Sequence, residues 1–482
     1  MRVGVEVTTG LRTGPSNPGP PSGIFQIAGV TERGPVEQTV QVKSLGEYTN
    51  LFGDRTPYSS NTFDTARLFF EEGGADLLVS RAVGPAATKG FLNLEDSVAV
   101  PTIKVEAKHP GGYSAGLTVA VENVADLVTI TISEGGEVLA RFRDLATVAD
   151  IVAAAAGNRH VNVTDLGSAT AAPGNLPATL AATALSAGED DRGNITATEI
   201  VSALETGGDQ IAGGAVAAPG YSSDIIGGAL IGYASGAGAI ALLAPHADAT
   251  KAEAIQAGDE LASAGAGAYA GLFWPHLSIP DGSGSRVISP EGYIAAVRAR
   301  AFREIGFWTA PAGDRATMQW ANGTVTAVTP EVNNELGAAY VNGIVTVAGR
   351  TKLYNWTSLS TDRANFALLS ARDTLNNLVR LVKTALEPFV FQTVDGRGHL
   401  LSQVESAAVS VVAPVAEAGG FFARMVGDEE IDPGYLVVVD STNNGLDNLE
   451  ENTVLVDISV RLSPVAALIK AEVVKVPLAA AL

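Results

Sequence analysis

The sequence contains no cysteine, and it has fewer charged residues than an average domain. Without cysteine the chain can form no disulfide bond, no thiolate metal site and no cysteine nucleophile. Charged residues make up 17% of the 482 residues, against about 25% in a typical domain. At roughly 150 residues per domain the length suggests about three domains, each with few charges to keep its surface hydrated.

The charge that is present is mostly negative. The chain has 52 acidic and 31 basic residues and a formal net charge of −21. This is the wrong sign for a protein that wraps nucleic acid or lies on an anionic membrane, so we expect no nucleic-acid partner. The first residues lack the basic and then apolar segments of a secretory signal peptide.

One stretch imitates a membrane span. Residues 225–245 carry no charge, and Gly228 and Gly232 have the spacing of a motif by which membrane helices dimerise. However, 11 of these 21 residues are Gly or Ala, which contribute little apolar area. We therefore predict a buried helix followed by a buried strand, and no membrane insertion.

The hydrophobic patterns predict an α/β (α+β) protein of several domains. Apolar runs bounded by turn residues alternate with helical patterns, which favours a layered α/β middle domain over residues 23–90 and 200–348. Ser44 and Glu47 have the spacing of a capping box at the start of one helix. The predicted strands lie at 24–30, 36–42, 75–83, 240–243 and 268–274, and the predicted helices begin near residues 44, 61, 222, 251 and 290.

Residues 91–199 have a different pattern, because short segments of alternating hydrophobicity replace the helix and strand units. Gly135 and Gly136 fit a hairpin turn between two such segments. We predict a β-rich inserted domain that faces outward, with a helix at 147–156. Its 14 acidic and 6 basic residues give a net charge of −8.

The two ends of the chain resemble arms that could add strands to another sheet. Residues 1–22 contain an alternating run followed by four prolines, and residues 466–482 follow a predicted C-terminal inner domain at 349–465. That domain is expected to hold long helices at 365–387 and 398–417. Strands are expected at 453–462 and 468–476. In the first of these strands the residues that share one face are Val454, Val456, Ile458, Val460 and Leu462.

No motif makes a positive case for catalysis, a cofactor or a metal. The five histidines are isolated, and neither a phosphate-binding loop nor a G-x-S-x-G sequence occurs. Glu189, Asp190 and Asp191 lack the ligand register of a calcium loop, which favours a solvated turn. One alternative stays open, an α/β enzyme that holds a phosphate at a glycine-rich helix terminus. The pairs Gly236/Gly238 and Gly282/Gly284 lack the third glycine and the strand-to-helix context of a phosphate cradle, so turns and close packing explain them.

A basic stripe on the helix predicted at 365–387 is more informative. Arg372, Arg380 and Lys383 fall on one arc beside the apolar face. The stripe is either a solvated helix edge, whose charges offset the helix dipole, or a contact surface for an acidic partner.

Three segments resemble phage tail sheath proteins, in the order found in that family. The first includes GIFQIAGVTERGPVEQTVQVKSLGEYTNLFGD and FDTARLFFEEGGADLLVSRAV, within residues 23–83. The second is SPEGYIAAVRARAFREIGFWTAPAGDRA at 289–316. The third combines GRTKLYNWTSLSTD at 349–362 with LEPFVFQTVDGRGHLLSQVESAAVSVV at 386–412. The inserted region, with HPGGYSAGLTVAV, is similar to a common insertion of the family.

The resemblance implies a structural protein rather than an enzyme. Sheath subunits polymerise as stacked rings around a tail tube, and the sheath contracts to drive the tube through the host cell envelope for genome delivery. The implied partners are further copies of the chain, the tail tube protein, and baseplate and tail terminator proteins. The implied location is the virion tail, assembled in the host bacterial cytoplasm. The sheath of a bacterial contractile injection system is the related alternative.

The resemblance also assigns roles to the arms and to the basic stripe. The C-terminal inner domain would face the tube, with Arg372, Arg380 and Lys383 in contact with it, and the inserted domain would lie outside. Both arms would add strands to a neighbour's sheet, as β-augmentation requires. The residues expected to take part in this exchange are Val3, Val5, Val7, Val454, Val456, Ile458, Val460, Ile469 and Val473.

Overall fold

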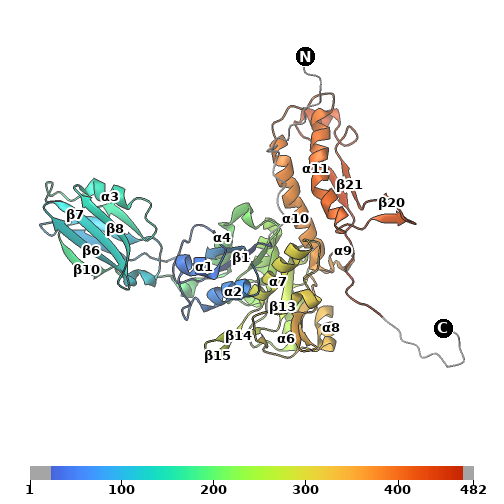
Figure 1. Ribbon diagram of the computed structural model, residues 1–482, viewed down its shortest axis with the longest axis horizontal. Helices are drawn as coiled ribbons and strands as arrows, with labels where there is room; N and C mark the ends of the chain where they lie inside the picture. The colour runs from blue at the N-terminus through green and yellow to red at the C-terminus, as the bar shows by residue number, and fades with distance from the viewer. Residues whose placement is uncertain (1–22, 471–482) are drawn as a thin grey trace, which may run out of the picture.

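The computed structural model describes residues 23–470, which form three lobes (Figure 1). A central α/β lobe carries a β-rich lobe on one side, and a pair of long helices projects from another side. The predicted class, a mixed α/β protein of several sheets, is confirmed.

An eight-stranded sheet forms the centre of the molecule. Its strand order is β18-β17-β13-β12-β11-β1-β3-β2, and the six strands from β17 to β3 are parallel. The two outermost strands, β2 and β18, pair antiparallel with their neighbours. The strands are β1 (Phe25–Gly29), β2 (Val40–Val42), β3 (Leu77–Arg81), β11 (Ala215–Ala217), β12 (Ile240–Leu243), β13 (Ala270–Trp274), β17 (Val341–Val347) and β18 (Arg350–Leu353).

Helices cover both faces of this sheet. Successive strand residues point to opposite sides, so strands that are apolar throughout give the sheet two apolar faces to bury. In β1, Phe25 and Ile27 enter one hydrophobic core and Ala28 enters the other. The first core is covered by α1 (Leu45–Phe52), α2 (Ser60–Glu71) and α7 (Glu291–Glu304). The second is covered by α4 (Ala197–Glu205), α5 (Ser223–Ala237), α6 (Lys251–Leu261) and α8 (Pro330–Ala338).

Two local predictions for the middle domain are confirmed, and one is too long. Ser44 caps α1 as predicted, because its hydroxyl accepts a hydrogen bond from the Glu47 amide, whereas the Glu47 carboxylate accepts from the Lys43 amide and not from Ser44. The uncharged segment 225–245 forms most of α5 and then the fully buried strand β12. The strand predicted at 36–42 is shorter, because only residues 40–42 reach the partner strand β3.

Residues 91–199 enclose a hydrophobic core of their own. A four-stranded sheet of order β10-β6-β7-β8 packs with a three-stranded sheet of order β4-β5-β9 and with α3 (Val148–Ala155) around this core. The Gly135–Gly136 turn joins β7 to β8 as predicted. The strands are β4 (Phe91–Glu95), β5 (Pro101–Ala107), β6 (Leu117–Val124), β7 (Leu127–Glu134), β8 (Glu137–Leu145), β9 (Val161–Asp165) and β10 (Leu180–Ala184).

A buried arginine anchors this β-rich lobe to the central lobe. The Arg81 guanidinium is 1% exposed and donates hydrogen bonds to the carbonyls of Gly34 and Pro110, each at 2.8 Å. It also pairs with the Asp190 carboxylate. The predicted solvated turn at 189–191 is therefore wrong for Asp190, because the Arg81 charge compensates its burial.

The C-terminal lobe is built around two long helices, α10 (Leu369–Leu386) and α11 (His399–Glu417). The helix predicted at 365–387 is interrupted, because Leu368 is extended at φ −111° and ψ 140° and separates α9 (Arg363–Phe366) from α10. α11 is long and apolar enough to cross a membrane, but Leu400, Val404 and Val412 bury its apolar face in the core of this lobe.

The domain boundary expected at residue 349 falls inside a hairpin of the central sheet. β17 and β18 pair antiparallel across that position. The chain stays with the central cores as far as Trp356, Leu359 and Leu369. The chain therefore passes from the central lobe to the C-terminal lobe within α10 and not at residue 349. Local sequence patterns do not reveal this, because it depends on which distant residues bury these side chains.

A second buried ion pair holds α10 against the central lobe. The Arg298 Nη2 atom of α7 lies 2.6 Å from Asp373 Oδ1 of α10, and the two side chains are 1% and 0% exposed. Arg298 also donates to the Gly213 carbonyl at 2.8 Å, and Asn377 of α10 donates to the same carbonyl at 3.2 Å. The C-terminal lobe is thus attached to α7, one of the helices that cover the central sheet.

Candidate functional site

A small sheet in the C-terminal lobe has strand edges open to further pairing. β21 (Tyr435–Val438) and β22 (Asp457–Val460) pair antiparallel, and within residues 23–470 neither has a second neighbour in the sheet. A sheet of two strands is marginally stable alone, and here it leans on α11 and the core of the lobe. Each strand keeps one row of backbone groups that can pair with an added strand.

The residues expected to exchange strands are placed in different ways. Val454, Val456, Ile458 and Val460 alternate as predicted and pack on the core of the C-terminal lobe. The regular strand covers 457–460, which is shorter than the expected 453–462, and it pairs within its own chain. β22 is therefore suited to accept a strand along its free edge.

The other expected exchange residues lie at the ends of the chain. Residue Ile469 is 84% exposed and belongs to no strand, so the strand predicted at 468–476 does not include residues 468–470. The remaining candidates, Val3, Val5, Val7 and Val473, lie outside the described residues.

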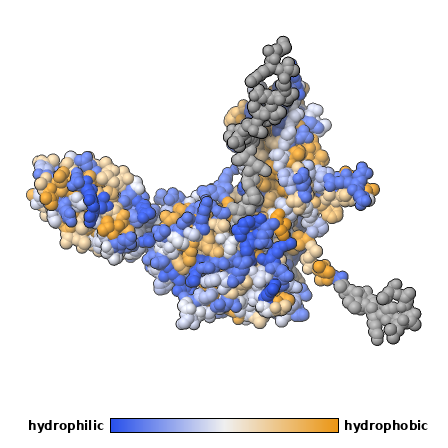
Figure 2. Space-filling model, in the orientation of Figure 1, coloured by the Kyte–Doolittle hydropathy of each residue, from blue (hydrophilic) through white to orange (hydrophobic). Residues whose placement is uncertain are grey.

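A projecting hairpin was not predicted. β19 (Arg424–Val426) and β20 (Glu429–Asp432) extend away from the two long helices (Figure 1). Val426 and Ile431 are 63% and 50% exposed and flank an acidic turn, so hydrophobic and hydrophilic residues meet on this projection (Figure 2). The alternation in RMVGDEEID was the available signal, but each strand is too short to stand out.

The basic stripe of α10 lies along the joint with the central lobe. The Arg372 guanidinium sits 4.3 Å from the ring centres of both Tyr269 and Phe366 and donates to the Tyr269 hydroxyl. Lys383 pairs with Asp209 at 2.6 Å, and both side chains are mostly exposed. Arg380 is half-buried beside Gly213. Arg372 therefore makes contacts within its own chain, and of the three basic residues Lys383 is the most accessible to a partner.

A cavity lies at the carboxyl ends of the parallel strands, where α/β sheets usually bind ligands. Its volume is about 210 Å³, and its polar lining residues are Asn61, Tyr221, Ser222, His246, His276, Ser289 and Glu291. The Glu291 side chain is 2% exposed, and burial raises its pKa to about 7. A phosphate here would face the carboxyl group of Glu291.

The two glycine pairs form no phosphate cradle, as the sequence indicated. Gly236 and Gly238 lie at the carboxyl end of α5, where the helix dipole repels anions. Gly282 and Gly284 form the turn between β14 (Leu277–Asp281) and β15 (Gly284–Ile288). Among the described residues no three or more His, Asp or Glu side chains are grouped to hold a metal ion.

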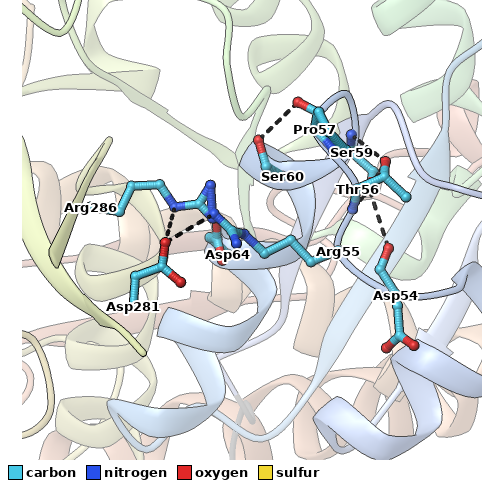
Figure 3. A network of polar contacts seen from close by, with 9 residues as sticks. All are labelled: Asp54, Arg55, Thr56, Pro57, Ser59, Ser60, Asp64, Asp281 and Arg286. Atoms are coloured by element: carbon cyan, nitrogen blue, oxygen red, sulfur yellow. Dashed lines mark hydrogen bonds and ion pairs between the residues drawn. The ribbon is translucent and has the colours of Figure 1, made fainter. Parts of the chain in front are cut away.

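A charged network beside this cavity fastens the β14–β15 hairpin to α2 (Figure 3). The Asp64 carboxylate lies 2.5 Å from Arg286 and 3.3 Å from Arg55, and Asp281 approaches both arginines more loosely. Burial raises the pKa of Asp64 to about 6, although Arg55 opposes that shift. The charges of the two carboxylates and the two guanidinium groups cancel, so the network has no unpaired charge that could attract an ionic ligand.

Comparisons with known proteins agree on the fold. No family model matches the sequence, and no curated protein matches it. Among the solved structures, 46 chains match. The sheath of an extracellular contractile injection system, PVC, in the contracted state is 14% identical. The match covers 98% of this chain and 97% of that one, with a TM-score of 0.57.

Two crystal structures of sheath tail proteins match as well. The protein from Desulfitobacterium hafniense is 14% identical over 90% of this chain and 94% of its own, with a TM-score of 0.57. The protein from Listeria innocua is 11% identical over 91% and 95%, with a TM-score of 0.61. The chain thus has the fold of tail sheath proteins over most of its length, and the resemblance inferred from the sequence is confirmed at the level of the fold.

Glu291 makes stability depend on pH in a defined direction. Its carboxyl group binds a proton more tightly in the folded chain, because its pKa rises from 4.5 to about 7. The stabilisation is present below pH 4.5 and is lost as the pH rises through 7. Relative to a Glu291→Gln variant, the wild type should lose about 3 kcal/mol of unfolding free energy between pH 4.5 and 8. Urea unfolding at both pH values measures this difference, and a constant difference would contradict the assignment.

Proposed function

We propose that this chain is the structural subunit of a contractile sheath. It polymerises as a helical tube around a rigid inner tube and contracts to drive that tube through a cell envelope. The observation that carries the proposal is the match to sheath structures over nearly the full length of both chains. Subunits held in a metastable lattice can release energy when better interfaces form, so contraction requires no nucleotide.

Strand exchange between neighbours is supported by the open sheet in the C-terminal lobe. β21 and β22 offer edges that an arm could extend, and the residues that face the core already hold the small sheet in place. The N-terminal run Val3, Val5 and Val7 and the C-terminal Ile469 and Val473 are the proposed donors. Main-chain hydrogen bonds of this kind hold subunits together while the lobes they connect change position.

The proposed contact with the inner tube is made by the C-terminal lobe. Lys383 and Arg380 remain its candidates, since Arg372 packs between two aromatic rings of its own chain. The inserted domain would lie outside, consistent with its acidic composition. Baseplate and terminator proteins are the further proposed partners, because solved baseplate assemblies of the anti-feeding prophage match the chain.

A phage tail, assembled in the host bacterial cytoplasm, is the proposed setting, and a bacterial contractile injection system is the second candidate. The sheath of one extracellular contractile injection system and the contracted helical sheath of the anti-feeding prophage are among the matching structures. The genes beside this one distinguish the two, since capsid and packaging genes accompany only a phage tail. A phosphate-binding enzyme is disfavoured by the carboxyl group of Glu291, which lines the cavity of the central sheet.

The purified chain should assemble into long hollow tubes with regular striations. Stacked rings of one subunit produce such striations, and negative-stain electron microscopy at increasing protein concentration detects them. A particle that stays monomeric at high concentration would contradict the proposal.

Deletion of residues 1–20 should prevent tube formation and leave folded monomers. The described fold begins after this segment, so the deletion removes none of the described residues of the four hydrophobic cores. Circular dichroism checks folding, and electron microscopy checks assembly. Normal striated tubes from the shortened chain would refute strand donation by this arm.

Reversing the charges of Arg380 and Lys383 to Glu should weaken assembly with the tube protein while sheath-only polymers still form. The reason is that both cations would meet an acidic tube surface. Lys251→Glu is the matched control, because Lys251 and Glu335 form a similarly exposed ion pair at 2.7 Å on the central lobe. Co-sedimentation with the tube protein measures the effect, and equal co-assembly of both variants would argue against the contact.

A further inference from the structure

The cavity at the carboxyl ends of β11, β12 and β13 has no role in the proposed sheath function, yet it is built from unusual residues. Glu291 begins α7, His276 follows β13, and the loop after β11 contributes Tyr221 and Ser222. With Asn61 of α2 and the loop after β12, five separate segments converge on a volume of about 210 Å³. The cavity is too small for a nucleotide and large enough for a compact polar group with water.

Two buried polar atoms at the cavity have no partner in residues 23–470. They are Oε2 of Glu291 and Nδ1 of His276, whose side chains are 2% and 6% exposed. An unpaired buried polar atom destabilises the folded state, and most buried polar atoms in folded proteins are paired. A bound group that supplies hydrogen-bond donors to both atoms would remove this cost.

The charges around the cavity favour a cation. Glu291 lines the cavity, and Asp248, after β12, is close enough to act on the charge of His276. Burial lowers the pKa of His276 to about 4, so at neutral pH its imidazole is uncharged and Nδ1 can accept a hydrogen bond. His246 is exposed at the rim, and the nearby Arg286 is engaged with Asp64. At pH 8, above its pKa of about 7, Glu291 is mostly ionised, and the amino end of α7 stabilises that charge.

We propose that this cavity binds a primary ammonium group. Such a group carries three N–H donors and a positive charge. Glu291 Oε2 and His276 Nδ1 would accept two of these hydrogen bonds, and the hydroxyl of Ser222 or Tyr221 is available for the third. The ammonium group belongs either to a free amine or to a lysine side chain of a second copy of this chain.

The probe is methylammonium chloride, compared with sodium chloride and tetramethylammonium chloride at equal ionic strength and pH 8. Methylammonium should raise the thermal unfolding midpoint by about 1–3 °C at saturation. The other two salts should not, because sodium donates no hydrogen bond and tetramethylammonium has no N–H group. Glu291→Gln should abolish the specific rise. Glu304→Gln, at the exposed end of the same helix, should retain it.

Equal shifts with all three salts, or a specific rise that survives Glu291→Gln, would overturn the proposal and leave water as the occupant. Polymer assembly then separates the two sources of the ammonium group. Inhibition of assembly by methylammonium, but not by sodium chloride, would assign the site to a neighbour's lysine. A specific thermal shift without inhibition would assign it to a free amine. The thermal measurement does not require assembly, so it stands even if the proposed sheath function fails.

Discussion

The buried ion pair between Arg298 and Asp373 is the contact on which the arrangement of the lobes depends. It connects the helix layer of the central sheet to the first helix of the C-terminal lobe, and the Gly213 carbonyl joins both sides. Loss of one partner from a buried pair typically costs about 3–5 kcal/mol, because the other charge stays buried. Arg81 and Asp190 serve the β-rich lobe in the same way. A subunit joined like this passes a displacement of one lobe on to the others.

The small number of charges is consistent with this construction. Several are used inside the chain, where they fasten one segment to another, as in the Arg55, Asp64, Asp281 and Arg286 network. Even the basic stripe contributes Arg372 to an internal contact with Tyr269. A subunit that hides much of its surface against neighbours needs fewer exposed charges than a monomer does. The open edges of β21 and β22 show where further pairing can begin.

Sequence patterns predicted most of the central lobe, because its elements are determined locally. Buried parallel strands such as β12 form continuous apolar runs in the sequence. The start of α1 depends on a contact between Ser44 and Glu47, which are only three residues apart. The misplacements have non-local causes. Leu368 interrupts a helical pattern, residue 349 lies inside a hairpin, and Asp190 is buried by an arginine more than a hundred residues away. The β19–β20 hairpin escaped prediction because three or four residues carry too little periodicity.

By itself the sequence determined the α/β class, the inserted β-rich region and the lack of a catalytic motif, since these depend on composition and short-range periodicity. Only the tertiary structure decided that Arg372 packs within the chain, that β22 pairs with β21, and that Glu291 and His276 meet in one cavity. Each of these contacts joins segments that are separate in the sequence. Burial and charge compensation bring them together, and neither is visible until the chain is folded.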